Sequence, residues 1–141
     1  MTAFEPLPTW VRFPPPHTWP EDDLIAIGGD LHPGPVLSAC RQGLFPMPLT
    51  PGELGWWSPV DRAILPFHRL RISRSLSRSC RRYTVSIDTD PIGVVEGCAD
   101  PSRPNGWITP EMRAAYPLLH RLGWVPSFEV WDGRGDPVGG L

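Results

Sequence analysis

Apolar residues recur with the period of a helix in several stretches of the chain, and the longest covers residues 110–122. Thr109–Pro110 is a favourable helix start, and Gly123 a favourable end. Pro117 lies inside this stretch and is expected to kink the helix. The predicted buried face comprises Met112, Ala115, Tyr116, Leu119 and Leu122. Shorter helices are predicted over residues 35–42, before Gly43, and over residues 91–99, after Asp90–Pro91.

A further helix is predicted over residues 71–83, with two different faces. One face carries Arg71, Arg74, Arg78 and Arg81, and the other carries Ile72, Leu76, Cys80 and Tyr83. Such a stripe of cations suits contacts with a phosphate backbone, although a solvated helix face would show the same pattern.

Strands are predicted where apolar residues form a short run or alternate: residues 24–27, 83–87, 125–131, and a last one from Val138. A tight turn is expected at 132–136. Residues 1–23 are proline-rich and extended, ordered by docking Trp10, Phe13 and Trp19, and residues 44–63 are expected to be turn-rich. These elements predict an α/β (α+β) chain with a small N-terminal α/β domain, residues 1–63, and a mixed-sheet domain, residues 64–141.

The composition limits the kinds of binding site that we expect in this chain. All 13 basic residues are arginine, and the net charge is −2. The three cysteines, Cys40, Cys80 and Cys98, show no zinc or disulfide spacing, which favours a reducing compartment, the cytoplasm. The four histidines are too widely spaced for a local metal motif, and no apolar run is long enough to span a membrane. We therefore expect no metal, no cofactor and no membrane partner.

Aromatic residues strengthen the case for nucleic acid. Trp56, Trp57 and Trp107 lie beside glycine, proline or a predicted helix start, and a tryptophan on a loop can stack on a base. The alternative is that each one belongs to the core, as most tryptophans do.

Other candidate motifs are better explained by local structure. Gly28–Gly29–Asp30 lacks the lysine and spacing of a phosphate-binding loop, and Arg134–Gly135–Asp136 suits a hairpin turn. Ser58 lacks a recognisable His/Asp pair. Glu129 alternates with apolar neighbours on a strand, so its alternatives are a surface position and a partly buried hydrogen-bonding role.

Taken in order, a set of short motifs resembles the leucyl/phenylalanyl-tRNA–protein transferase family from about residue 20 to residue 141. The motifs are Ile27-Gly28-Gly29-Asp30-Leu31, Gly43-Leu44-Phe45-Pro46, Trp56-Trp57-Ser58-Pro59 with Arg62, Ile72-Ser73-Arg74-Ser75, Glu96-Gly97-Cys98-Ala99, Trp107-Ile108-Thr109, Glu129-Val130-Trp131 and Val138-Gly139-Gly140. The resemblance implies an N-acetyltransferase-like second domain. It also implies transfer of leucine or phenylalanine from tRNA to proteins that begin with arginine or lysine, which marks them for degradation.

The resemblance also implies roles for individual residues. Trp107 would contact the terminal adenosine, and the helix of Arg74 and Arg78 would follow the acceptor-stem phosphates. Leu141 would open the amino-acid pocket. Met47 and Cys40 stand where the family usually has aromatic residues. The full set expected at the aminoacyl-adenosine end is Trp107, Met47, Leu141, Trp56 and Trp57, and the set expected at the phosphates is Arg74, Arg78, Arg71 and Arg81.

Two functions stay open at this stage. In the first, the chain is an incomplete transferase whose catalytic residues are expected beyond residue 141, so that residues 1–141 alone are inactive. In the second, it is a non-catalytic module that binds the acceptor end of tRNA.

Overall fold

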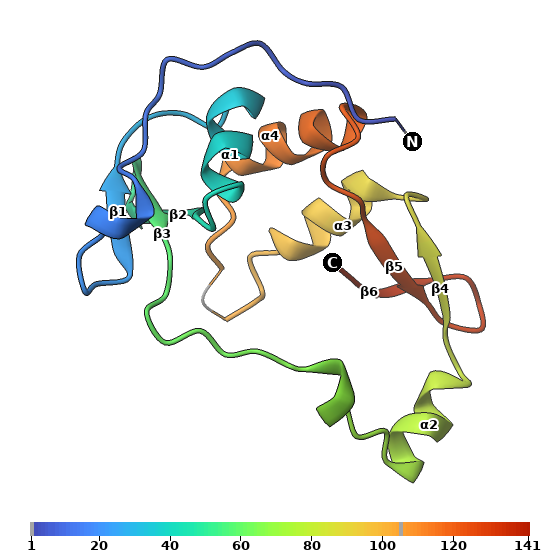
Figure 1. Ribbon diagram of the computed structural model, residues 1–141. Helices are drawn as coiled ribbons and strands as arrows, with labels where there is room; N and C mark the ends of the chain where they lie inside the picture. The colour runs from blue at the N-terminus through green and yellow to red at the C-terminus, as the bar shows by residue number, and fades with distance from the viewer. Residues whose placement is uncertain (1, 105) are drawn as a thin grey trace.

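The computed structural model describes residues 2–104 and 106–141, which form two three-stranded antiparallel sheets with helices between them in the chain (Figure 1). The predicted α/β class is confirmed, while the likeness to N-acetyltransferases stays a prediction. In chain order the elements are η1 Pro16–Thr18, β1 Leu24–Ile27, α1 Pro33–Cys40, β2 Phe45–Thr50, β3 Glu53–Trp57, η2 Phe67–Arg69, α2 Arg74–Cys80, β4 Thr84–Ile87, α3 Pro91–Cys98, α4 Pro110–Arg121, β5 Phe128–Trp131 and β6 Pro137–Gly140.

The first sheet contains a hairpin where only turns were expected. Strands β2 and β3 pair with each other, and β1 pairs with the other side of β3, so that β3 is central. The prediction of a turn-rich stretch over residues 44–63 was therefore wrong. Pro46 and Pro48 hid the strand in the sequence, but β2 lies at the edge of the sheet, where a residue without an N–H is tolerated.

Helix α1 is confirmed, beginning and ending two residues earlier than predicted. Gly43 has a φ of +87°, which an L side chain rarely adopts. Its N–H donates to the Cys40 carbonyl at 3.0 Å, and the Leu44 N–H donates to the Ala39 carbonyl at 3.0 Å. The glycine therefore ends the helix and turns the chain into β2.

The second sheet has the order β4-β5-β6 and agrees with the strands predicted around residues 83–87, 125–131 and 138. The predicted turn at 132–136 is also confirmed. The Asp132 carboxylate accepts from the N–H groups of Arg134 at 2.8 Å and Asp136 at 3.0 Å. A side chain that satisfies two turn amides fixes the β5–β6 connection.

Both helices after β4 begin with the predicted caps. The Asp90 carboxylate accepts from the Gly93 N–H at 2.9 Å, and the Thr109 hydroxyl accepts from the Met112 N–H at 3.3 Å. Helix α4 runs through Pro117 without a break. Met112, Ala115 and Leu119 are buried as predicted, and Tyr116 and Leu122 are half-buried.

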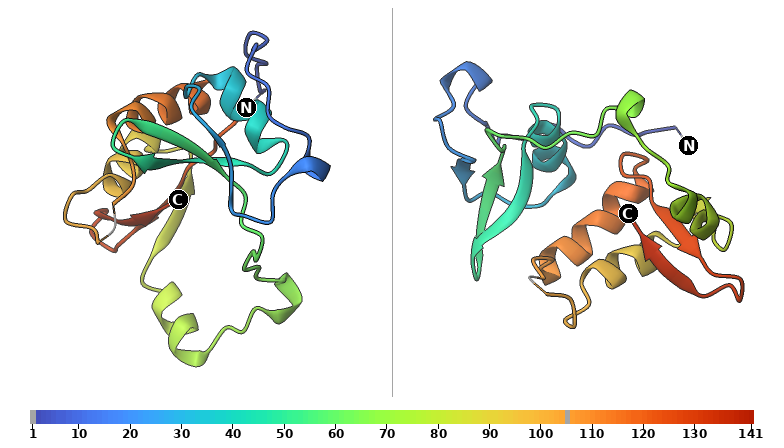
Figure 2. Two further views of the ribbon diagram at one scale, coloured as in Figure 1. Left: turned by 90° about the vertical axis from the view of Figure 1, so that its left-hand side faces the viewer. Right: turned by 90° about the horizontal axis from the view of Figure 1, so that it is seen from below.

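The two sheets are joined through their helices (Figure 2). Helix α3 packs on β5 and β6, and α4 packs on both α3 and α1. The central core cluster contains Val36, Leu37, Ala39, Leu44, Trp56 and Leu119. Leu119 lies on α4, so this cluster draws on both parts of the sequence, and the division into domains at residue 63 stays a prediction.

The proline-rich N-terminal segment packs against the core only in part as expected. Phe13 packs edge-on against Trp56, with the two ring centroids 4.9 Å apart. Trp19 packs against the core, and its indole N–H donates to the Pro14 carbonyl at 2.8 Å. Trp10 is exposed, so its predicted docking was wrong. Closer to the N-terminus, the Phe4 carbonyl accepts a hydrogen bond from the Trp124 indole N–H at 2.7 Å.

Candidate functional site

Neighbouring tryptophans on β3 have opposite environments because side chains alternate along a strand. Trp56 points into the core, is only 1% exposed, and donates from its indole nitrogen to the Gly28 carbonyl at 2.8 Å. Its predicted loop position was wrong, and no ring face is free for a base. A prediction of the β2–β3 hairpin would have placed Trp56 in a strand. The prolines of β2 made that hairpin difficult to predict from the sequence.

Trp57 lies on the other face of the same sheet, and its indole N–H donates to the Met47 carbonyl at 3.1 Å. Gly55 makes this arrangement possible, since a Cβ at Gly55 would lie 2.6 Å from the Trp57 indole nitrogen. The structure therefore brings together two of the residues expected at the aminoacyl-adenosine end. Both are half-buried, so part of each remains accessible.

A cleft of about 260 Å³ lies between the first sheet and the start of α4. Its walls are Gly29, Asp30, Leu31, Pro48, Gly52, Glu53, Leu54, Thr109 and Glu111. A hydrogen bond from Thr109 lowers the pKa of Glu111, so this carboxyl is ionised near neutral pH. Two residues before Thr109, Trp107 is 43% exposed in the loop that leads into α4.

Leu141 lies away from these residues in the second sheet. Its N–H and carbonyl pair with the carbonyl and N–H of Phe128, both at 2.9 Å, so the pairing of β5 and β6 extends through it. Its side chain is exposed. Among the described residues, no hydrogen bond or ring contact joins Leu141 or Trp107 to Met47 and Trp57.

The arginine helix is shorter than predicted. Helix α2 begins at Arg74, because the Ser73 hydroxyl accepts from the Leu76 N–H at 3.1 Å and caps it. Arg71 therefore precedes the helix and Arg81 follows its last turn. The apolar side chains of this segment are not buried, since Ile72, which precedes α2, and Leu76, which lies within it, are exposed.

Three of the four predicted arginines lie on one surface. Arg74, Arg78 and Arg81 line one shallow depression with Ile72, Ser73 and Ser77, while Arg71 lies outside it. No Asp or Glu occurs between residues 62 and 87, whereas six of the 13 arginines lie between residues 69 and 82. In the part of the chain that the structure describes, none of these arginines forms an ion pair. Figure 1 shows α2 standing away from both sheets.

Glu129 is the buried carboxylate of the second sheet, with 2% of its surface exposed. It accepts hydrogen bonds from the Ser86 hydroxyl at 2.5 Å and the Ser127 hydroxyl at 2.6 Å. The N–H groups of Asp90 and Thr89 add bonds at 3.2 and 3.4 Å. The hydrogen-bonding alternative predicted for Glu129 is confirmed. Ser86 and Ser127 were missed, although their places beside Glu129 follow from strand pairing and sequence.

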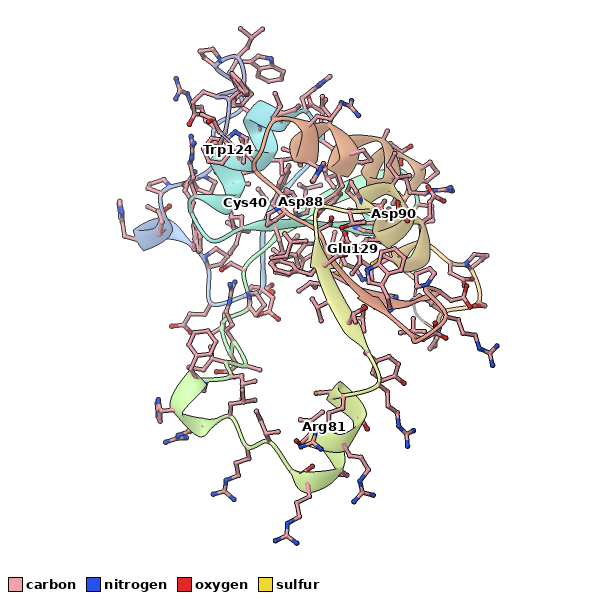
Figure 3. All side chains as sticks on the ribbon, turned by 90° about the vertical axis from the view of Figure 1, so that its right-hand side faces the viewer. Cys40, Arg81, Asp88, Asp90, Trp124 and Glu129 are labelled. Carbon is pink, nitrogen blue, oxygen red and sulfur yellow. The ribbon has the colours of Figure 1, made fainter. Side chains whose placement is uncertain are left out.

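The environment of Glu129 favours its ionised form. Burial by itself would raise the pKa, but the bonds from Ser127, Ser86, Asp90 and Thr89 outweigh it and lower the pKa to about 2. Figure 3 shows Glu129 beside Asp88 and Asp90, far from Arg81. A carboxylate with so low a pKa and four donors is suited to joining β4, β5 and α3 and is poorly suited to accepting a proton near pH 7.

Within residues 2–104 and 106–141 no cluster of three or more His, Cys, Asp or Glu side chains is arranged to hold a metal ion. The same residues include no helix long and apolar enough to cross a membrane. Cys40 ends α1, and its thiol is free, as are those of Cys80 and Cys98.

Comparison with known proteins gives one consistent result. The sequence model described as leucyl/phenylalanyl-tRNA protein transferase matches residues 64–141, and the model of that protein's N-terminal domain matches residues 29–60. The leucyl/phenylalanyl-tRNA–protein transferase of Anaeromyxobacter sp. (strain Fw109-5) is 44% identical over 140 residues, which cover 96% of this chain and 59% of the relative.

Two further relatives carry the same name. That of Nitratidesulfovibrio vulgaris (strain DP4) is 47% identical over 126 residues, covering 85% of this chain and 53% of the relative. That of Syntrophus aciditrophicus is 42% identical over 142 residues, covering 96% and 59%. The chain thus spans a little over half the length of the curated relatives it matches. From residue 29 onward, both family models are matched in order, and the chain belongs to the leucyl/phenylalanyl-tRNA–protein transferase family.

Proposed function

We propose that this chain forms the tRNA-binding part of an aminoacyltransferase. The reaction moves leucine or phenylalanine from aminoacyl-tRNA to proteins that begin with arginine or lysine, in the cytoplasm, and so marks them for degradation. The observation that carries the proposal is the depression lined by Arg74, Arg78 and Arg81, which lies in a segment without acidic residues. The names of the relatives support both the tRNA and the protein substrate.

The arginines of α2 suit the phosphates of an acceptor stem. Arg74 and Arg78 are four residues apart, so they occupy successive turns on one side of the helix. A guanidinium binds phosphate through two parallel N–H groups and never loses its charge near neutral pH. In the left view of Figure 2, α2 projects away from both sheets, which supports its accessibility to an RNA duplex.

Trp107 is the residue we propose for the terminal adenosine. Its side chain is partly exposed, and it lies just before α4. Thr109 caps the first turn of α4, and Thr109 and Glu111 line the neighbouring cleft. A flat ring at such a position stacks on a base. Met47 and Trp57 are proposed to hold the same end from the first sheet, and Leu141 to contact the side chain of the esterified amino acid. Trp56 is left out because it is buried.

The chemistry itself needs little activation. The α-amine of the acceptor protein attacks the ester carbonyl carbon, a C–N bond forms, and the C–O bond to the adenosine breaks, with the amine proton ending on the released hydroxyl. The protein's task is to position both reactants and to give the proton a path. Glu129 is not proposed as that proton acceptor, because its oxygens are occupied and its pKa is about 2.

The second candidate is a module that binds the tRNA end without catalysing transfer. It is favoured by one observation: Glu129, the buried carboxylate of the second sheet, has its oxygens occupied by four donors and a pKa of about 2, so it does not serve as a proton acceptor near pH 7. A transfer assay with radiolabelled leucyl-tRNA and a peptide beginning with arginine separates the candidates. Under the second candidate, residues 1–141 bind the tRNA but give no labelled peptide above a blank without protein.

The proposed tRNA contact is tested by replacing Arg74 and Arg78 together with alanine. We expect weaker binding of leucyl-tRNA, and a plot of log affinity against log salt that is shallower by roughly 1.4 to 1.8, because two phosphate contacts are lost. Filter binding at several salt concentrations measures both effects.

A matched control replaces Arg12 and Arg134, two exposed arginines outside the α2 segment, with alanine. This variant carries the same change in net charge, so it should keep the slope of the unaltered chain. Equal slopes for the two double variants would show that the α2 depression is only a solvated surface.

A further inference from the structure

The arginines of α2 line a single depression instead of forming an even row of separate cations. Arg74, Arg78 and Arg81 line it together, and Ser73 and Ser77 contribute to its walls. The fourth cation of the predicted stripe lies outside it. A row of phosphates along an RNA strand would be matched by cations spread along the helix, whereas these three share one place. The depression is therefore suited to one group that carries more than a single negative charge.

No nearby carboxylate balances the positive charge of this depression. In the part of the chain that the structure describes, none of its three arginines forms an ion pair. The sequence from residue 62 to residue 87 contains no Asp or Glu. Figure 3 shows Arg81 at the end of α2, away from both sheets. An anion that binds here therefore displaces no ion pair within the protein.

Charge and the number of free oxygens distinguish two kinds of phosphate in RNA. A phosphodiester inside a strand carries one negative charge on two non-bridging oxygens. A terminal phosphomonoester carries a charge of about −1.5 to −2 near pH 7 and has three strong acceptor oxygens. A guanidinium binds such oxygens through two parallel N–H groups. Three guanidinium groups in one depression therefore match a terminal phosphomonoester better than an internal phosphodiester.

We propose that the depression on α2 holds the 5′-terminal phosphomonoester of the tRNA, an inference that rests on the tRNA binding proposed above. The 5′ phosphate lies where the paired acceptor stem ends, and the unpaired 3′ end separates it from the terminal adenosine. The structure suits this separation. Helix α2 lies apart from the loop that leads into α4 in Figure 1 and in both views of Figure 2. One site thus holds the end of the stem, while the other is left for the adenosine.

The experiment compares two forms of one leucyl-tRNA that differ only at the 5′ end. A phosphatase removes the 5′ phosphate before aminoacylation, and a polynucleotide kinase with ATP restores it in a recovery control. In filter binding to residues 1–141, loss of the phosphate should weaken the affinity roughly tenfold, because charge-assisted hydrogen bonds are lost. Its return should restore the affinity. The protein is the same in every sample, so a change in folding does not account for the difference.

Protein variants assign the effect to the depression. When Arg74 and Arg78 are both replaced with alanine, the two tRNAs should bind with nearly equal affinity, because the group that distinguishes them has lost its partners. Arg78→Lys keeps the charge without the two parallel N–H groups, so it should keep only part of the difference. The matched control is Arg12→Ala, at an exposed arginine outside α2, which should keep the whole difference.

Equal affinities of the two tRNAs for the unaltered chain would overturn this inference alone, since tRNA binding would stand and α2 would contact internal phosphodiesters. A difference that persists in full in the Arg74/Arg78 variant would also overturn it, because another part of the chain would then bind the 5′ end. So would displacement of the phosphorylated tRNA by an equal concentration of a nucleoside 5′-monophosphate, which would assign the depression to a free nucleotide. If neither tRNA binds, the inference and the proposed function both fail.

Discussion

At the scale of single residues, the environment of a side chain decides its role more than its type does. Trp56 and Trp57 are adjacent, yet one is part of the core and the other faces outward beside Met47. Glu129 is a carboxylate buried in a sheet, where desolvation opposes charge, but two hydroxyls and two amides reverse that effect. These environments predict how substitutions at these positions change the stability of the fold.

Glu129→Gln should remove an acid-sensitive part of the stability. The folded-state pKa of about 2 lies below the ordinary value of 4.5, so the carboxylate stabilises the fold fully above about pH 4.5. This contribution is lost as the pH falls from there through 2. Melting temperatures measured from pH 7 to pH 2 should show the variant lower by several degrees at pH 7 and the two proteins converging in acid. A constant gap over this range would mean that the Glu129 charge contributes nothing.

Trp56→Ala and Trp107→Ala should affect different properties. Truncating the buried Trp56 should lower the free energy of unfolding by about 3–5 kcal/mol. Truncating the half-exposed Trp107 should leave unfolding largely unchanged and weaken leucyl-tRNA binding by about 1–3 kcal/mol. Chemical denaturation and filter binding measure the two effects. A large loss of stability in the Trp107 variant would assign it to the core and withdraw it from the site.

At the scale of elements, local signals predicted most helices and missed a hairpin. Asp90–Pro91 and Thr109–Pro110 placed the starts of α3 and α4 correctly, because a cap is a short-range interaction that the sequence records directly. The β2–β3 hairpin was missed, because only its position at a sheet edge makes its prolines acceptable. Helix α2 was predicted too long, because Ser73 caps it within the arginine pattern.

The contact between α3 and β6 depends on Gly140. A Cβ there would lie 2.8 Å from a Val94 methyl and 3.1 Å from the Phe128 carbonyl oxygen, so Gly140→Ala should destabilise the fold by about 1–3 kcal/mol. Gly139→Ala is the control, since its Cβ would meet only Val130, at 4.0 Å, and the change should stay within about 0.5 kcal/mol. Urea unfolding of both variants measures this difference, and equal stabilities would contradict the packing described for α3.

At the scale of the whole molecule, the order of motifs predicted the family, but the geometry of the site came only from the structure. The predicted arginines were largely brought together, with Arg71 left outside the depression. The predicted aminoacyl-adenosine residues were only partly brought together, as Met47 with Trp57. Contacts between distant elements, such as Leu119 of α4 against the core of α1 and β3, have no local signature in a single sequence.

The central claim is that this chain binds the acceptor end of tRNA through α2 and the loop before α4. Hydrogen exchange of residues 1–141, measured with and without leucyl-tRNA, tests it most directly. We predict slower exchange at residues 73–82 and 106–112 when leucyl-tRNA is bound, with no change in the proline-rich N-terminal segment, residues 2–23. Unchanged exchange in both segments at saturating leucyl-tRNA, or protection confined to other segments, would contradict it.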